Sequence, residues 1–235
     1  EWISLLTDGI EQNLSDPGWR SRIWDRTDDN RTVFYDSDNW RRISEYEQFV
    51  YRSPCVDVAT ALLNTDSVNF FFDAIFVRST GVTFQTPWHQ DEHPIPTRDR
   101  SLIAVWLALE DTTTQNSCLW FIPESHKKGV IYERYEHNEP DVDSMTIARG
   151  FDDSTEKPIE MKANSALFFS GYLIHSSKKN VSDNYRPALT IHYCTSSTYL
   201  PWQGETNYRG VVQVKGTDPY ASEGYTQPVP WAKIE

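Results

Sequence analysis

The sequence predicts a mainly β fold with a helical N-terminal layer, whose core is an antiparallel barrel or a double-sheet jelly roll. Two observations carry this prediction. After residue 64, short apolar runs rich in β-branched and aromatic residues follow one another, separated by turn residues and not by helices. The first 64 residues instead contain stretches with helical periodicity. Because a parallel βαβ fold alternates strands with helices, this order of elements disfavours it.

The helical layer is expected over residues 1–64. Its first helix ends at the Asp-Pro-Gly triplet 16–18 and carries apolar residues at helical spacing on one face, namely Ile3, Leu6, Ile10 and Leu14. Residues 43–51 are expected to form a second helix. A short third helix near 56–63 has Ser53 as its N-cap and Pro54 in its first turn. The polar stretch 20–40 is expected to be a long loop.

The β core is expected over residues 65–195. Its strands are predicted at 68–78, 102–109, 119–122, 166–169 and 188–194. Residues 124–158 are polar and acidic, which is typical of a long insertion between strands. Residues 196–235 are expected to be a tail that wraps the domain. No internal repeat divides the chain, so we expect one domain over residues 1–235.

Composition disfavours several classes of partner. The 235 residues include 22 Lys+Arg and 34 Asp+Glu, a net charge of −12, and a negative field repels nucleic acid and anionic membrane surfaces. No apolar run reaches the ~18 residues that a membrane-spanning helix needs. The chain opens on Glu1-Trp2-Ile3 without a signal segment, and its 3 cysteines lack metal-type spacing. We therefore expect a cytoplasmic protein with free, inert thiols.

The most informative segment is Thr86-Pro87-Trp88-His89-Gln90-Asp91. Residues i and i+2 of a strand share a face, so His89 and Asp91 would present an imidazole and a carboxylate side by side. These groups are two thirds of a 2-His-1-carboxylate site, which holds non-haem Fe(II) and leaves coordination positions open. The pattern is weak alone, because a surface histidine beside a solvated aspartate also produces it.

Two later residues strengthen this interpretation. His175 follows a buried strand and a turn, so it can enter the barrel and meet His89 and Asp91. Arg186 opens the next interior strand, where a buried guanidinium is costly unless it pairs with an anion. Its planar fork suits a carboxylate. His192, on the same strand, is expected to be a satisfied core histidine.

With their surroundings, these residues resemble the phytanoyl-CoA dioxygenase family. The resemblance covers roughly residues 66–195 and is carried by the segments TPWHQD, SLIAVWLALED, WFIPESHKKG, LIHSS and YRPALTIHY. Members of that family are Fe(II)- and 2-oxoglutarate-dependent oxygenases on a double-stranded β-helix, a cupin-like jelly roll. The resemblance therefore implies iron as the metal, and 2-oxoglutarate and O₂ as cosubstrates.

The resemblance also implies roles for particular residues. His89, Asp91 and His175 would ligate iron, and Arg186 would bind the distal carboxylate of 2-oxoglutarate. Ser177 would add a hydrogen bond to that carboxylate. Two further cosubstrate contacts are expected, the aromatic wall of Trp106 and the side chain of Thr86.

The implied reaction is hydroxylation of an unactivated C–H bond, or another oxidation such as desaturation, with release of succinate and CO₂. Three protein ligands leave two positions for the 2-oxo acid and one for O₂. Related halogenases carry a small residue at the carboxylate position, so Asp91 argues against halogenation.

The substrate is expected to be a small organic molecule. Lys127-Lys128 and Lys178-Lys179 are the only adjacent lysine pairs, so the acidic chain disfavours a coenzyme A thioester. The resemblance leaves amino acid-like compounds, aminophosphonates and secondary metabolites, and the abundant aromatic residues suit a neutral or cationic compound. Position along the chain suggests five pocket residues, Phe71, Gln90, His93, Tyr199 and Trp202, although His93 could equally close a loop.

Two alternatives remain open. One is an enzyme of the same barrel that uses another metal, such as zinc, which favours three histidines or a cysteine and has no use for Arg186. The other is a non-catalytic small-molecule binding module that keeps the fold. The complete set of His89, Asp91, His175 and Arg186 argues against the second.

Overall fold

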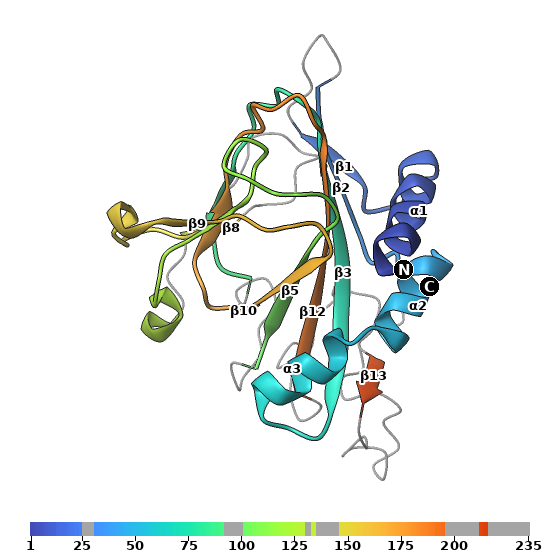
Figure 1. The fold of residues 1–235 in the computed structure, drawn as a ribbon. Helices are drawn as coiled ribbons and strands as arrows, with labels where there is room; N and C mark the ends of the chain where they lie inside the picture. The colour runs from blue at the N-terminus through green and yellow to red at the C-terminus, as the bar shows by residue number, and fades with distance from the viewer. Residues whose placement is uncertain (25–30, 92–100, 130–132, 135–145, 196–211, 216–235) are drawn as a thin grey trace.

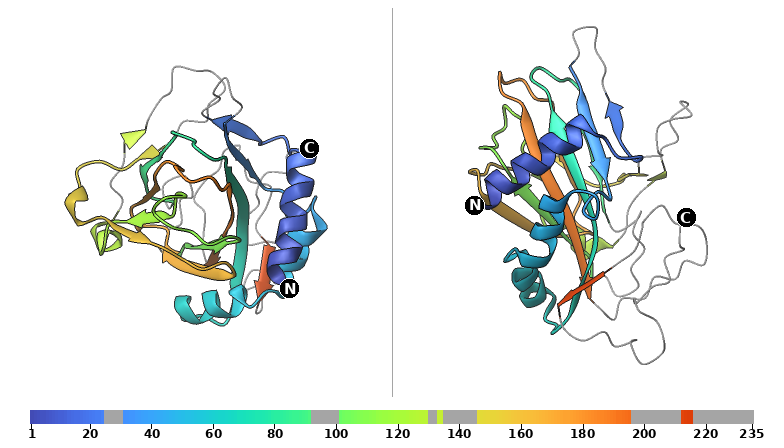
Figure 2. Two further views of the ribbon diagram at one scale, coloured as in Figure 1. Left: turned by 45° about the horizontal axis from the view of Figure 1, so that its top comes forward. Right: turned by 90° about the vertical axis from the view of Figure 1, so that its right-hand side faces the viewer.

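In a computed structural model of the chain, the described residues are 1–24, 31–91, 101–129, 133–134, 146–195 and 212–215. Two antiparallel sheets enclose a barrel, and helices cover the outside of the larger sheet (Figures 1 and 2). This arrangement confirms the predicted mainly β fold with a helical N-terminal layer.

The larger sheet has the strand order β1-β2-β3-β12-β5-β10, and β13 also pairs with β3. Its strands are β1 (Arg22–Trp24), β2 (Val33–Ser37), β3 (Val68–Arg78), β5 (Ile103–Ala108), β10 (Ser165–Ser170), β12 (Arg186–Thr195) and β13 (Val212–Lys215). The smaller sheet has the order β4-β11-β6-β9. Its strands are β4 (Thr86–His89), β6 (Leu119–Phe121), β9 (Lys157–Ile159) and β11 (His175–Ser177). From β3 to β12 the chain passes repeatedly from one sheet to the other, as in a jelly roll.

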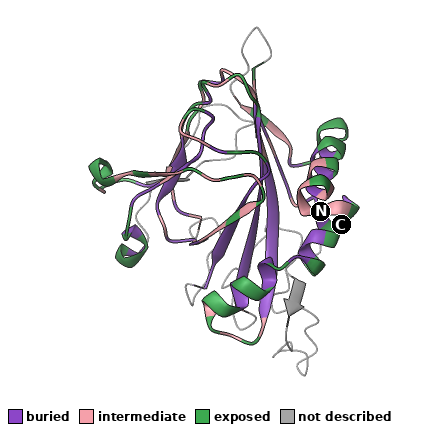
Figure 3. Ribbon diagram, viewed as in Figure 1, coloured by how far each residue is buried: buried purple, intermediate pink, exposed green. Residues whose placement is uncertain are grey.

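Three helices pack on the outer face of the larger sheet, α1 (Trp2–Ser15), α2 (Ser44–Arg52) and α3 (Cys55–Leu63). The periodic residues Leu6 and Ile10 of α1 are buried, as predicted, in one core with Ile75 of β3 and Ile191 of β12. Figure 3 shows the central strands buried along their length and the helices exposed on their outer sides. The main hydrophobic core therefore lies between helices and sheet. A separate apolar cluster that includes Trp106, Phe121 and Phe169 lies on the barrel side, beside the polar groups.

Strand β12 contributes two of the polar groups of the interior, Arg186 and His192. Its register pairs Arg186 with Arg78 and His192 with Phe72 on β3, and alternation places Arg186 and His192 on the same face. The ladder is irregular between His192 and Tyr193, because these neighbours pair with Phe72 and Phe70, which are two residues apart on β3. A bulge of this kind re-aims side chains next to a site.

The stretch 20–40 departs from the predicted long loop. It contains β1 and β2, which extend the larger sheet beyond β3. The apolar side chains of Val33 and Phe34 explain the difference, because both are buried and Phe34 belongs to the core between the helices and the sheet. Ser53 is also not the N-cap of α3, since Pro54 occupies that position.

The insertion 124–158 contains short elements in its described part. These are η1 (Ser125–Lys128), β7 (Glu133–Arg134), β8 (Thr146–Ile147), η2 (Asp153–Thr155) and the start of β9. Of the tail 196–235, only β13 is described, and it pairs with β3. The predicted wrapping by the rest of the tail lies outside the described residues.

The three cysteines, Cys55, Cys118 and Cys194, are free and buried, as predicted. Burial raises the pKa of Cys55 and of Cys118 to about 11. Within the described ranges, no helix is both long enough and apolar enough to cross a membrane.

Candidate metal centre and its anion site

His89 and His175 face each other across the smaller sheet, where the register pairs β4 with β11 at these two residues. Their ring centroids lie 4.1 Å apart. The Nδ1 of His89 lies 2.8 Å from the carbonyl oxygen of Pro87, and that of His175 lies 2.9 Å from the carbonyl oxygen of Leu173. A carbonyl only accepts, so Nδ1 carries the hydrogen, and Nε2 is the ring nitrogen that each histidine can offer to a metal.

Asp91 completes the group just after the end of β4. Its Oδ1 lies 3.6 Å from the Nε2 of His89 and 3.7 Å from the Nε2 of His175. The candidate ligand atoms of all three residues lie within 4.8 Å of one another. The structure thus brings together the three residues that the sequence predicts as ligands, although Asp91 lies at a bend and not inside the strand.

The electrostatics of the group favour a cation. Burial alone would raise the pKa of Asp91, but the imidazoles of His175, His192 and His89 outweigh it and hold this pKa well below its usual range. Burial lowers the pKa of His175 to about 4, with a further contribution from His89 and against the opposing charge of Asp91. At neutral pH the group therefore presents neutral His175 and an ionised carboxylate, which are the protonation states that a metal requires.

These residues fit an Fe(II) ion. Two imidazoles and one carboxylate are the donor set of non-haem Fe(II) oxygenases, and they leave positions open. Both histidines have the carbonyl partner that orients a metal ligand. The rings of Phe169 and Phe121 pack against His175, with centroids 4.8 and 5.8 Å away.

Arg186 is buried inside the barrel with 1% of its surface exposed. Its Nη2 lies 3.5 Å from Ser117 Oγ, whereas its Nε and Nη1 have no hydrogen-bond partner among the described residues. Burial, and then the charge of Arg78, lower the pKa of Arg186 well below its usual value. A buried guanidinium with unused donors is a site for an anion.

Sequence reasoning missed Arg78, which lies directly opposite Arg186 in the β3–β12 ladder and is fully buried. Its guanidinium donates to Thr86 Oγ1 at 2.6 Å, to Ser177 Oγ at 2.8 Å and to the carbonyl oxygen of Phe84 at 2.7 Å. Ser177 and Thr86 also hydrogen-bond each other at 3.1 Å. The sequence did contain an indication, because Arg78 is the last residue of a strongly apolar strand. Burying such a cation is costly unless it pairs with an anion.

Trp106 is buried on the inner face of β5, and the guanidinium carbon of Arg186 lies 5.4 Å from its ring centre. It therefore lines the same interior as the two arginines.

The predicted substrate residues have mixed positions. The amide nitrogen of Gln90 donates to the carbonyl oxygens of Gly129 at 2.8 Å and Tyr172 at 2.6 Å, which uses both of its hydrogens and gives this buried side chain a structural role. Phe71 is buried in a cluster with Phe72 and Leu102, and its ring contacts that of Phe72. His93, Tyr199 and Trp202 lie outside the described residues.

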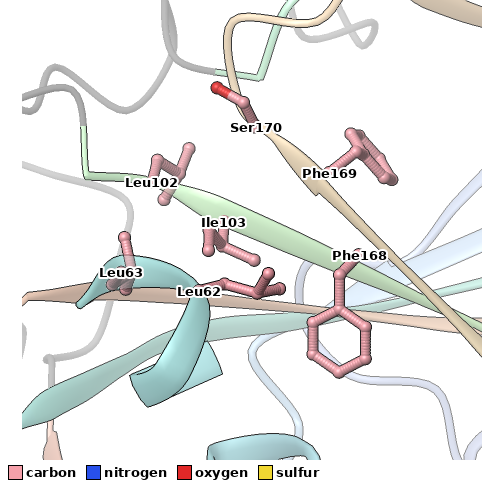
Figure 4. Close-up of a pocket in the computed structure, with 7 residues that line it drawn as sticks. All are labelled: Leu62, Leu63, Leu102, Ile103, Phe168, Phe169 and Ser170. Carbon is pink, nitrogen blue, oxygen red and sulfur yellow. The ribbon is translucent and has the colours of Figure 1, made fainter. Parts of the chain in front are cut away.

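One apolar pocket of roughly 300 Å³ lies where α3 meets β5 and β10 (Figure 4). Leu62, Leu63, Leu102, Ile103, Phe168, Phe169 and Ser170 line it. Phe169 is shared with the metal-ligand surroundings, because its ring packs on His175. None of the described residues that line the pocket is charged, so they offer apolar contact and no anchoring charge.

Comparison with known proteins gives the family. A family model described as phytanoyl-CoA dioxygenase matches residues 6–188. The Arabidopsis thaliana phytanoyl-CoA dioxygenase is 32% identical over 151 residues, which cover 64% of this chain and 53% of that protein. The human peroxisomal phytanoyl-CoA dioxygenase is 30% identical over 140 residues, which cover 57% of this chain and 38% of that protein. The chain therefore spans about half the length of such relatives, or less.

Two solved structures show the same fold. The non-heme alpha ketoglutarate dependent carbocyclase SnoK from nogalamycin biosynthesis superposes with a TM-score of 0.66 at 20% identity, covering 94% of this chain and 81% of that one. The epimerase SnoN, in complex with Fe3+, alpha ketoglutarate and nogalamycin RO, superposes with a TM-score of 0.67 at 16% identity, covering 92% and 88%. These likenesses confirm the predicted cupin-like jelly roll. Since the phytanoyl-CoA dioxygenase model matches well over half of the residues of this chain, the chain belongs to the phytanoyl-CoA dioxygenase family.

Proposed function

We propose that this protein is an Fe(II)- and 2-oxoglutarate-dependent dioxygenase that hydroxylates an unactivated C–H bond of a small organic molecule. The observation that carries the proposal is the group of His89, Asp91 and His175, in which both Nε2 atoms face one oxygen of the carboxylate. When bound there, iron with 2-oxoglutarate and O₂ supplies the oxidising chemistry, with release of succinate and CO₂.

In this proposal, residues of the smaller sheet bind the metal and residues of the larger sheet bind the cosubstrate's distal carboxylate. His89, Asp91 and His175, from the smaller sheet and the bend after it, hold the metal. Arg186 and Arg78, from the larger sheet, hold the distal carboxylate of the cosubstrate, and Ser177 and Thr86 reach the same place through their bonds to Arg78. Trp106, whose ring lies beside Arg186, forms the aromatic wall of the cosubstrate site. This separation of a cation site from an anion site suits a molecule with an oxo acid at one end and a carboxylate at the other.

The proposed substrate is an amino acid-like compound, an aminophosphonate or a secondary metabolite. The net charge of −12 supports a neutral or cationic compound over a coenzyme A thioester and over nucleic acid. Phe71, His93, Tyr199 and Trp202 remain proposed substrate contacts, whereas Gln90 is withdrawn because its amide is bound to backbone carbonyls. We also propose that residues 1–235 act as a single oxygenase domain, and the buried free thiols support a reducing, cytoplasmic location.

Two measurements test the function. Purified protein under anaerobic conditions is mixed with Fe(II) and 2-oxoglutarate, and we expect a weak visible charge-transfer band. In air with ascorbate, a panel of small molecules is screened for succinate release and for products heavier by one oxygen atom. A product lighter by two hydrogens indicates desaturation, and a product of unchanged mass indicates isomerisation such as epimerisation.

Variants locate the activity. Asp91→Ala should abolish the charge-transfer band and succinate release, because one ligand and one negative charge are lost. His126→Ala, which changes an exposed histidine away from the site, is the matched control and should behave like the unmodified protein. Normal turnover in Asp91→Ala, or no metal-dependent binding of 2-oxoglutarate by the unmodified protein, would contradict the proposal.

A further inference from the structure

A third imidazole lies beside the candidate ligands without belonging to them. His192 is buried, and its Nε2 lies 3.1 Å from Asp91 Oδ2. The group whose ligand atoms all lie close together consists of His89, Asp91 and His175. Those two histidines approach the other oxygen of Asp91, Oδ1. The two carboxylate oxygens therefore face different partners.

We propose that His192 is a positioning residue that restricts Asp91 to monodentate metal binding through Oδ1. The proposal rests on the proposed iron site and adds a residue to it. A carboxylate accepts hydrogen bonds, so Nε2–H of His192 donates to Oδ2. An Oδ2 that holds this hydrogen bond is not available as a second ligand atom, and the coordination position that a bidentate carboxylate would take stays open for the cosubstrates.

The backbone around Asp91 explains why such a partner is needed. β4 ends at His89, and Asp91 lies at a bend two residues further on, outside the β4–β11 ladder. The ladder therefore does not fix the direction of its side chain. His192 instead lies on β12, which is paired on both sides, with β3 and with β5. A residue on β12, in the centre of the larger sheet, thus orients Asp91, which follows the last residue of a strand in the smaller sheet.

The ring of His192 is itself held in place. It stacks on Phe72, with centroids 4.3 Å apart and an angle of 5° between the planes. The two residues are register partners next to the irregular step of the β3–β12 ladder. Its Nδ1 has no hydrogen-bond partner among the described residues, so the bond to Asp91 and the stacking define its orientation.

The test compares four variants by metal binding without turnover. His192→Phe keeps the ring and the stacking on Phe72 but removes the donor, and His192→Gln retains an N–H near the place of Nε2. Tyr193→Phe changes a buried residue at the next position of β12 and is the matched control. His89→Ala removes a ligand. Each protein is titrated anaerobically with Co(II) by calorimetry, and the visible spectrum of the bound Co(II) reports its coordination.

We expect His192→Phe to weaken Co(II) binding by about 10- to 100-fold and to change the Co(II) spectrum, as losses of outer hydrogen-bond partners do in other metal sites. His192→Gln should recover most of the affinity, and Tyr193→Phe should match the unmodified protein. Circular dichroism checks that each variant is folded.

The outcomes separate this proposal from the proposed function. If the unmodified protein binds no metal, the iron site itself is wrong. If it binds metal and His192→Phe binds with the same affinity and spectrum, His192 does not position Asp91. If His192→Phe loses binding as completely as His89→Ala, His192 is a ligand and the proposal is also wrong. If a variant fails to fold, the unmodified protein still tests the proposal. Infrared difference spectra of its metal-bound form that show bidentate Asp91 would overturn the proposal directly.

Discussion

Arg78 and Arg186 lie directly opposite each other on adjacent antiparallel strands, and both are buried inside the barrel. Like charges in such a pair repel, and each guanidinium has also lost its hydration. An anion placed between them removes both costs. The pair therefore indicates a site that is completed by a carboxylate.

The first prediction concerns ligand stabilisation. In the presence of metal, 2-oxoglutarate should raise the unfolding temperature, whereas 2-oxobutyrate, which has the oxo acid but no second carboxylate, should raise it much less. A ligand at about 100 times its Kd stabilises the folded state by about 2.7 kcal/mol. Thermal unfolding followed by fluorescence gives the comparison. Equal shifts for the two acids would mean that the arginine pair does not hold the distal carboxylate.

The second prediction concerns Arg186 itself. Arg186→Met should raise the half-saturating concentration of 2-oxoglutarate by on the order of 100-fold, because a charged hydrogen bond to a buried carboxylate contributes about 1.5–3 kcal/mol. The Fe(II) affinity should change little. Without cosubstrate, the variant should be at least as stable as the unmodified protein, because the repulsion from Arg78 is gone. Parallel losses of iron and cosubstrate binding would instead assign Arg186 a structural role.

The third prediction concerns Asp73, on the helix side of β3. Burial raises its pKa to about 7, against the opposing backbone N–H groups of Asn39 and Trp40 and with a further increase from Asp38. The pKa is thus higher in the folded than in the unfolded protein, and the folded state binds the proton more tightly. Stability should therefore be greatest below about pH 4 as far as this group is concerned, and its contribution should fall as the pH rises to about 7.

The measurement is the urea midpoint between pH 5 and pH 8. Asp73→Asn cannot titrate, so the fall in stability over this range should become smaller, even though the variant is less stable overall because one acceptor oxygen is lost. Asp183→Asn, an exposed change, is the control and should keep the full pH dependence. An unchanged slope in Asp73→Asn would show that another group titrates.

The fourth prediction concerns the turn between β10 and β11, which leads to His175. A Cβ on Gly171 would lie 2.7 Å from Leu102 Cδ2 and 3.1 Å from Leu102 Cβ. Gly171→Ala should therefore destabilise the protein by about 1–3 kcal/mol, the usual cost of overpacking. Combining it with Leu102→Ala should cost less than the sum of the two single changes. Additive losses, measured by urea unfolding, would mean that the two residues do not clash.

The grouping of His89, Asp91 and His175 can be predicted from the sequence because their side chains are typical metal ligands and lie in or beside segments that are easily recognised as strands. His89 and Asp91 are close in sequence, and His175 and Arg186 are each preceded or followed by a strand of obvious apolar character. The three predicted ligands do meet. The strand 68–78 is also predicted with the bounds that the structure gives it.

The parts that sequence reasoning missed depend on contacts between distant strands. Arg78 closes a strand as an ordinary charged end residue, and only the β3–β12 register shows that it faces Arg186. His192 is expected to be a satisfied core residue, yet it lies six positions after Arg186, an even number, and so shares its face. That parity was the available signal. Strands β1 and β2 lie among polar residues, and they form by pairing with each other and with β3, which is distant in the sequence.

The proposed reaction with O₂ would expose the protein's own side chains to stray oxidants, and two of its thiols suit that setting. Oxidation of cysteine begins with the thiolate. Burial raises the pKa of Cys55 and Cys118 to about 11, so at neutral pH almost no thiolate is present at either residue. Both sulfur atoms are therefore slow to react with peroxide that escapes from the site, and incomplete turnovers should harm the exposed aromatic and histidine side chains before they harm these two cysteines.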